Sequence, residues 1–153
     1  MSTIRRSIRR YKQAIQAPHP IPRNLHEMVI PDEYKTTCKG ENFLLYDSGL
    51  SENRILLFST EKNMQLLQAS SDWFCDGTFK VVPELFYQLY SIHCLISNKT
   101  IPCDFALLSN KCQVTYEEHF SLVRAINSRL NPVSILIDYE QAAGNLMTEI
   151  AFF

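Results

Sequence analysis

Two aspartates are the residues of this chain whose type and position could do chemistry. Asp76 lies in the run Trp73-Phe74-Cys75-Asp76-Gly77-Thr78-Phe79, and Asp138 directly follows the apolar run Ser134-Ile135-Leu136-Ile137. Each carboxylate stands on or at the end of a predicted buried strand, where a charge is costly unless it has a partner or a cation. Two acids at two strand ends therefore predict a site for a divalent metal ion.

Three other polar residues near these runs have simpler interpretations. Glu140 fits best as an acid at the start of a helix, where the helix dipole favours negative charge. His93 lies within an apolar strand and His119 lies on a predicted helix. We interpret both as core or surface histidines.

The elements that must position the aspartates follow from apolar periodicity and turn residues. Residues 43–46 and 54–58 predict a hairpin, and Thr60 predicts the cap of a short helix. Three strands are predicted at 73–82, 85–96 and 101–108, with a break at Pro83 and a turn at Asn98-Lys99.

A helix, a fourth strand and a last helix complete the predicted order. Thr115 and Glu118 predict a capping box for a helix that runs to about Leu130. Its predicted buried face consists of Phe120, Val123, Ile126 and Leu130. Residues 133–137 are apolar enough to predict a strand buried on both faces, and residues 141–153 predict the last helix.

A crossover helix between the third and fourth core strands implies a parallel pair. The predicted fold class is therefore α/β, an incomplete ribonuclease H-like mixed sheet without its fifth strand, in which the fourth strand lies parallel beside the first. This order would place Asp76 and Asp138 side by side. The predicted organisation is a basic helix and Pro-rich linker at 1–23, a small α+β lead-in at 24–70 and the partial catalytic-type domain at 71–153.

Positive charge is concentrated at the N-terminus. Residues 1–23 carry six basic residues and no acid, whereas residues 24–153 carry nine basic and 16 acidic residues. The candidate contacts to DNA phosphates are Arg5, Arg6, Arg9, Arg10 and Lys12. The same segment could serve as a nuclear import signal, or it could be a solvated helix face.

Membrane and secretory classes are not expected. No stretch approaches the roughly 20 apolar residues of a membrane span, and no apolar segment follows the basic N-terminus. The five cysteines show no C-x-x-C pair, so reduced and mostly buried thiols in an intracellular protein are the favoured interpretation.

Several motifs together resemble the transposase domain of the Mutator-like (MULE) family of DDE transposases. They include Asp76-Gly77-Thr78-Phe79, Phe86-Tyr87-Gln88-Leu89-Tyr90-Ser91-Ile92-His93, Ala106-Leu107-Leu108-Ser109-Asn110-Lys111, Thr115-Tyr116 and Asp138-Tyr139-Glu140-Gln141-Ala142-Ala143. Two earlier segments, Ile4-Arg5-Arg6 and Gly40-Glu41-Asn42-Phe43-Leu44-Leu45, look like the stretch before that domain. The resemblance extends over nearly the whole chain.

The resemblance implies a two-metal enzyme that nicks DNA and transfers a strand. It makes Asp76 and Asp138 the first two catalytic, metal-binding aspartates, with Mg²⁺ or Mn²⁺ as the cofactor, DNA as the partner and the nucleus as the location. The family's third acid, a glutamate, would lie past Phe153. We therefore expect weak metal binding and little or no activity from this sequence.

Two other functions remain open. A domesticated, non-catalytic remnant could bind DNA or a protein, and the open edge beside the fourth core strand invites such a protein partner. A 3′–5′ exonuclease uses the same fold, but it needs a second acid two residues after the first aspartate, where this chain has Thr78.

Overall fold

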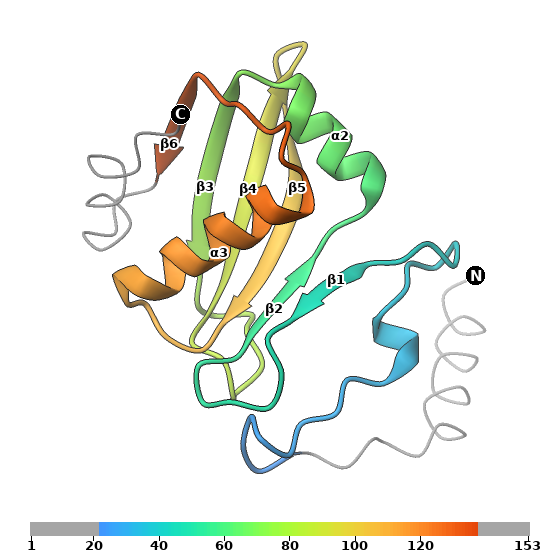
Figure 1. The fold of residues 1–153 in the computed structure, drawn as a ribbon, viewed down its shortest axis with the longest axis vertical. Coiled ribbons are helices and arrows are strands. Elements are labelled where there is room, and N and C mark those ends of the chain that lie inside the picture. The colour runs from blue at the N-terminus through green and yellow to red at the C-terminus, as the bar shows by residue number, and fades with distance from the viewer. Residues whose placement is uncertain (1–21, 138–153) are drawn as a thin grey trace, which may run out of the picture.

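The computed structural model describes residues 22–137, which form one mixed sheet with two α-helices. The elements are the short 3-10 helix η1 (Asp32–Tyr34), β1 (Leu44–Asp47), β2 (Ile55–Phe58), α2 (Glu61–Ala69), β3 (Asp72–Thr78), β4 (Gln88–Ile96), β5 (Lys99–Leu108), α3 (Gln113–Ile126) and β6 (Ser134–Ile137). The strand order in the six-stranded sheet is β1-β2-β5-β4-β3-β6 (Figure 1).

The pairing of β6 confirms the predicted crossover. β6 lies parallel beside β3, whereas every other neighbouring pair of strands is antiparallel. α3 makes the connection from β5 to β6 across one face of the sheet (Figure 1). The hairpin of β1 and β2 extends the same sheet, because β2 pairs with β5.

The main core lies between the sheet and the two helices. Alternate residues of β3 point into it, with Trp73 and Cys75 buried. Met64 and Leu67 of α2 and Phe120 of α3 are part of the same cluster. Burial of these side chains, at about 25 cal/mol per Å² of apolar surface, holds both helices on this face.

A smaller apolar cluster covers part of the opposite face. Leu25 and Phe86 pack there against Leu56 of β2, and flanking residues come from the N-terminal segment and from the β3–β4 loop. Asp76 is exposed, and it alternates along β3 with the buried Trp73 and Cys75. Its side chain therefore lies on the sheet face that the helices do not cover.

The structure corrects the predicted limits of several elements. β3 ends at Thr78 and β4 begins at Gln88, so the segment between them is a longer loop than predicted. α3 begins at Gln113, with Cys112 rather than Thr115 at its N-cap, and it ends at Ile126. Ile126 is exposed, contrary to the prediction, whereas Phe120, Val123 and Leu130 are buried.

The prediction that β6 is buried on both faces is wrong. Leu136 is 64% exposed, and Val133 just before the strand is also exposed. Only alternate residues of β6 contribute to the core, where Ile135 and Ile137 pack against it. Asp138, Glu140, the predicted helix 141–153 and the basic segment with Arg5, Arg6, Arg9, Arg10 and Lys12 lie outside the described residues.

Candidate functional site

Asp76 lies on the open face of the sheet, two residues before β3 ends. Its neighbours on that face are oxygen-bearing side chains, because Thr78 follows on the same strand and Ser91 is opposite in β4. The Thr78 hydroxyl donates to the Asp76 carboxylate at 3.5 Å, the upper limit of a hydrogen bond. The carboxylate is thus exposed and only weakly held, which leaves its oxygens able to bind a cation.

The serine opposite Asp76 in β4 contacts a histidine on the same strand. Ser91 Oγ lies 2.9 Å from Nε2 of His93, two residues along the same face of β4. The Ser91 hydroxyl also lies 3.4 Å from the main-chain oxygen of Asp76. His93 is half-buried. The sequence prediction did not include this Ser–His contact, although the spacing of two in a strand puts both side chains on one face.

β6 borders the site on the other side of β3. The described register runs from Asp72 opposite Ser134 to Cys75 opposite Ile137. Asp76 and Asp138 are the residues that follow this last pair in the sequence. The structure therefore places Asp76, while Asp138 is beyond its described range.

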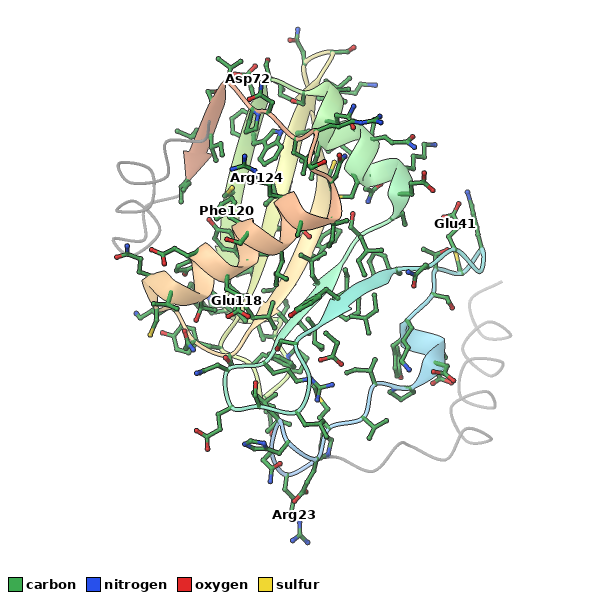
Figure 2. All side chains as sticks on the ribbon, viewed as in Figure 1. Arg23, Glu41, Asp72, Glu118, Phe120 and Arg124 are labelled. Atoms are coloured by element: carbon green, nitrogen blue, oxygen red, sulfur yellow. The ribbon has the colours of Figure 1, made fainter. Side chains whose placement is uncertain are left out.

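A third aspartate, which the sequence did not single out, anchors β6 to β3. The Ser134 hydroxyl donates to Asp72 Oδ1 at 2.6 Å, and the Ser71 hydroxyl donates to Oδ2 at 2.7 Å. These hydrogen bonds, from Ser134 first and Ser71 second, hold the pKa of Asp72 below its usual value of 3.8. Figure 2 shows Asp72 at the start of β3, close to β6. Both of its oxygens already have partners, so Asp72 is a structural residue.

The side chains around Asp76 offer oxygen ligands, the kind that a hard cation prefers, but they offer few of them. A carboxylate with neighbouring hydroxyls suits Mg²⁺ or Mn²⁺, which prefer oxygen. Across residues 22–137, however, no group of three His, Cys, Asp or Glu side chains could hold a metal ion. The described part of the chain thus contributes one carboxylate to the predicted site.

A contact between an aspartate and a histidine is enclosed in the core, separate from this face. Asp104 of β5 and His119 of α3 are fully buried, with 2.6 Å between Asp104 Oδ2 and His119 Nε2. The Tyr90 ring meets the imidazole edge-on, with 5.6 Å between ring centroids. A pair with no exposed surface cannot reach a substrate, so this contact joins α3 to the sheet. Asp104 was not singled out from the sequence, because this residue lies alone within an otherwise apolar predicted strand.

Gly77 allows a close approach next to this buried polar region. A Cβ at Gly77 would lie 3.0 Å from Oε1 of Gln88, a fully buried side chain. Gln88 Nε2 in turn donates to the Tyr116 hydroxyl at 2.7 Å. A side chain at Gly77 would therefore press against Gln88, which favours glycine at this position.

Comparisons of the chain with protein-family models, with curated proteins and with solved structures find no match. In the part of the chain that the structure describes, no helix is both long enough and apolar enough to cross a membrane.

Proposed function

We propose that this chain carries the two-aspartate part of a metal-dependent DNA cleavage and strand-transfer site, on a ribonuclease H-like sheet of the Mutator-like DDE type. The observation that supports it most is the parallel pairing of β6 with β3 beside an exposed Asp76. If that pairing continues by one residue, Asp138 becomes the neighbour of Asp76. Two adjacent carboxylates at the open face then form the core of a divalent metal site.

Asp76 and Asp138 are the proposed ligands for Mg²⁺ or Mn²⁺. When bound, such ions activate the attacking oxygen and stabilise the leaving oxygen of a phosphodiester. The chain's own contribution is to hold the Asp76 carboxylate on a rigid strand, next to the Thr78 and Ser91 hydroxyls. With two protein carboxylates the affinity for metal is weak, and we expect little or no nicking by this chain alone.

DNA is the proposed partner, and the nucleus is the proposed location. The basic residues Arg5, Arg6, Arg9, Arg10 and Lys12 are the proposed phosphate contacts. Because the rest of the chain is net acidic, such contact is local. Its affinity should fall steeply as salt rises, since each neutralised phosphate releases counterions.

Metal titration tests the proposal. Electron paramagnetic resonance measures the concentration of free Mn²⁺ during the titration. We expect Mn²⁺ to bind the full chain weakly. Replacing either carboxylate, as Asp76→Asn or Asp138→Asn, should weaken that binding by about tenfold or more, because a charged ligand is lost. The matched control is Glu84→Gln, an exposed acid in the β3–β4 loop, which should leave the affinity unchanged.

Equal Mn²⁺ affinity in wild type, Asp76→Asn and the control would overturn the site. Strong metal-dependent nicking of a supercoiled plasmid, abolished by Asp76→Ala, would keep the site but contradict the expected low activity.

A second candidate function is a non-catalytic binding module that uses the edge of β6. Among residues 22–137, no strand pairs with the outer side of β6, and Leu136 on it is 64% exposed. An exposed edge strand offers unpaired main-chain groups to another chain. This candidate becomes the better account if Asp76 has no part in metal binding.

A further inference from the structure

The loop between β3 and β4 presents two large aromatic side chains to solvent at the Asp76 end of the sheet. Phe79 is 46% exposed and Tyr87 is 44% exposed. Their rings pack edge to face, with 5.6 Å between centroids and an interplanar angle of 81°. This geometry leaves ring surface of both residues free to contact a further flat group.

One buried side chain and two main-chain hydrogen bonds hold the end of this loop in place. Phe86 is buried in the small apolar cluster with Leu25 and Leu56. The Tyr87 N–H donates to the main-chain oxygen of Leu108 at 2.8 Å, and the Phe86 N–H donates to that of Pro83 at 2.9 Å. The backbone of Tyr87 is therefore held in place, and Phe79 directly follows β3, so little ordering would be needed when a ligand binds.

One lysine contacts the aromatic pair, and a second follows Phe79 in the chain. The Lys111 ammonium lies 5.7 Å from the centroid of the Tyr87 ring, a cation–π distance. Lys80 follows Phe79 directly and is exposed. Within the loop, Lys80 and the exposed Glu84 balance in charge, and Lys111, from the segment between β5 and α3, adds the positive charge beside Tyr87. Exposed aromatic rings with lysines nearby are the arrangement with which proteins bind unpaired nucleotides, by stacking on bases and by attraction to phosphates.

We propose that Phe79, Tyr87, Lys80 and Lys111 form a binding surface for single-stranded DNA. The proposal deepens the proposed function, on which it rests for the choice of DNA. Bases of a duplex are stacked on one another and cannot reach the rings, so an unpaired strand is the better fit. Phe79 is three residues beyond Asp76, at most about 10 Å of extended chain. A nucleotide stacked on the pair thus lies close to the proposed metal site.

Fluorescence anisotropy with the full chain and a labelled thymidine oligonucleotide measures this binding. Loss of one stacking ring, as Phe79→Ala or Tyr87→Ala, should weaken binding by about tenfold, whereas Tyr87→Phe keeps the ring and should retain affinity. Lys111→Gln should weaken binding less and reduce its dependence on salt. The matched controls are Tyr34→Ala, which removes an aromatic ring that is 58% exposed on η1, and Lys62→Gln on α2.

The surface is supported if the loop variants lose affinity, the controls retain it, and a duplex of the same length competes poorly. It is overturned if wild type does not bind the oligonucleotide at millimolar protein, if loop variants and controls behave alike, or if the duplex binds as well. A loop variant that unfolds is replaced by Phe79→Leu, which fills the same space without a stacking ring and carries the same expectation.

The outcome is separable from that of the proposed function. Mn²⁺ affinity that depends on Asp76 together with unchanged oligonucleotide binding in the loop variants would reject the surface alone. The reverse pattern would reject the metal site and leave the surface standing. If the loop variants keep their affinity for DNA but lose affinity for an unrelated peptide, the rings belong to a site for a protein partner and the proposal is rejected.

Discussion

At the scale of single residues, burial separates the five cysteines into two classes. Cys38 and Cys112 are exposed, whereas Cys75, Cys94 and Cys103 are buried. Burial raises the pKa of Cys75 to about 12. Burial, together with the neighbouring Cys94 thiol at 3.3 Å between sulfurs, raises the pKa of Cys103 to about 12. Thiolate is the reactive form of cysteine, so the buried thiols should be inert in the folded chain.

This difference predicts the outcome of thiol titration with a chromogenic disulfide reagent near pH 8. Cys38 and Cys112 should react quickly, and the three buried thiols should react only as the chain unfolds. In denaturant all five should react at one rate. The variant Cys38→Ser with Cys112→Ser should lose the fast phase completely. A fast phase that persists in this double variant would show that the main core is open to solvent.

At the scale of elements, local signals were sufficient for turns and for one helix cap. Ser97 and Asn98 both have left-handed backbone, with φ of 51° and 59°, and they form the two-residue turn between β4 and β5. The sequence predicted this turn to within one residue, because Asn tolerates that conformation. The predicted cap of α2 is confirmed, since the Thr60 hydroxyl accepts the Asn63 N–H at 3.2 Å.

Side-chain contacts and spatial neighbours, which apolar periodicity does not show, explain the elements that the sequence placed incorrectly. Asn110 accepts the Cys112 N–H at 2.9 Å and the Thr115 hydroxyl at 2.7 Å, so α3 starts before Thr115. The exposure of β6 depends on what lies beside it in space, which apolar composition cannot reveal. The same holds for the site: Asp76 was predicted from its motif, but the role of Asp72 depends on Ser134, 62 residues away.

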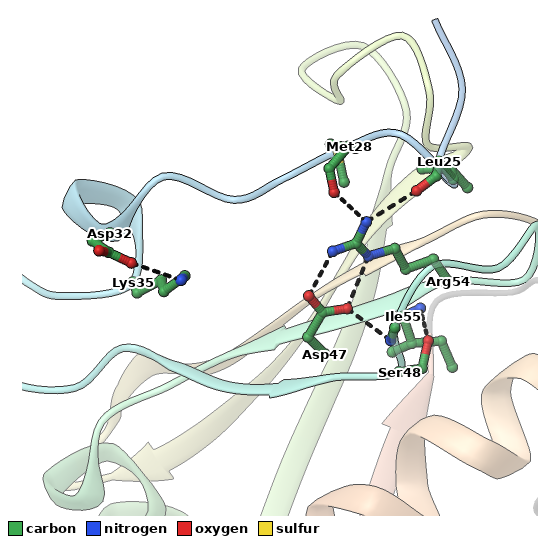
Figure 3. Close-up of polar contacts among 9 residues, drawn as sticks. Leu25, Met28, Asp32, Lys35, Asp47, Ser48, Arg54 and Ile55 are labelled. Carbon is green, nitrogen blue, oxygen red and sulfur yellow. Dashed lines mark hydrogen bonds and ion pairs between the residues drawn. The ribbon is translucent and has the colours of Figure 1, made fainter. Parts of the chain in front are cut away.

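The β1–β2 hairpin is fastened to the N-terminal segment by one arginine. Arg54 is 3% exposed and binds both carboxylate oxygens of Asp47, at 2.8 Å and 2.6 Å (Figure 3). Its remaining nitrogen donates to the main-chain oxygens of Leu25 at 3.0 Å and Met28 at 2.6 Å. A planar five-donor group can make all four contacts, whereas lysine cannot.

We therefore expect both Arg54→Lys and Arg54→Ala to destabilise the chain. The free energy of unfolding of the alanine variant should fall by about 3 kcal/mol, because a partly buried carboxylate and two carbonyls lose their hydrogen-bond partner. Urea unfolding measures the change. The matched control is Lys35→Ala, since Lys35 pairs with Asp32 at 2.7 Å on the exposed surface, and its midpoint should stay at the wild-type value. Equal midpoints for all variants would contradict the role of Arg54.

The same contact sets a dependence on pH. Burial alone would raise the pKa of Asp47, but the Arg54 hydrogen bonds and the Gly49 N–H outweigh it and hold this pKa below 3.8. A carboxyl with a lowered folded-state pKa stabilises the chain above its unfolded pKa and loses that contribution as pH falls through the folded value. The difference in stability between wild type and Arg54→Ala should therefore narrow below about pH 4.

At the scale of the whole molecule, the central strands of the sheet are paired on both sides, whereas the strands toward its two edges have fewer contacts. β4 lies between β3 and β5 and pairs with each of them over most of its length. β1 and β2 continue the sheet beyond β5, and β6 continues it beyond β3 (Figure 1). Within residues 22–137, β6 is half exposed, and the contacts that attach it to the sheet are its parallel pairing with β3 and the Asp72 hydrogen bonds. The proposed metal site lies at the β6 side of the sheet.

Hydrogen exchange followed by mass spectrometry should show this order of stability. Amides of β4 and β5 should exchange most slowly, and those of β6 most rapidly among the six strands, because opening of an edge strand exposes little apolar surface. Asp72→Ala removes the acceptor for the Ser71 and Ser134 hydroxyls, so exchange in residues 134–137 should become faster while β4 and β5 keep their protection. The matched control, Glu117→Ala, alters an acid on α3, far in sequence from that contact. Slow exchange in β6 that Asp72→Ala does not change would show that another part of the chain holds this edge, and the Asp72 contact would then be incidental to the position of the proposed site.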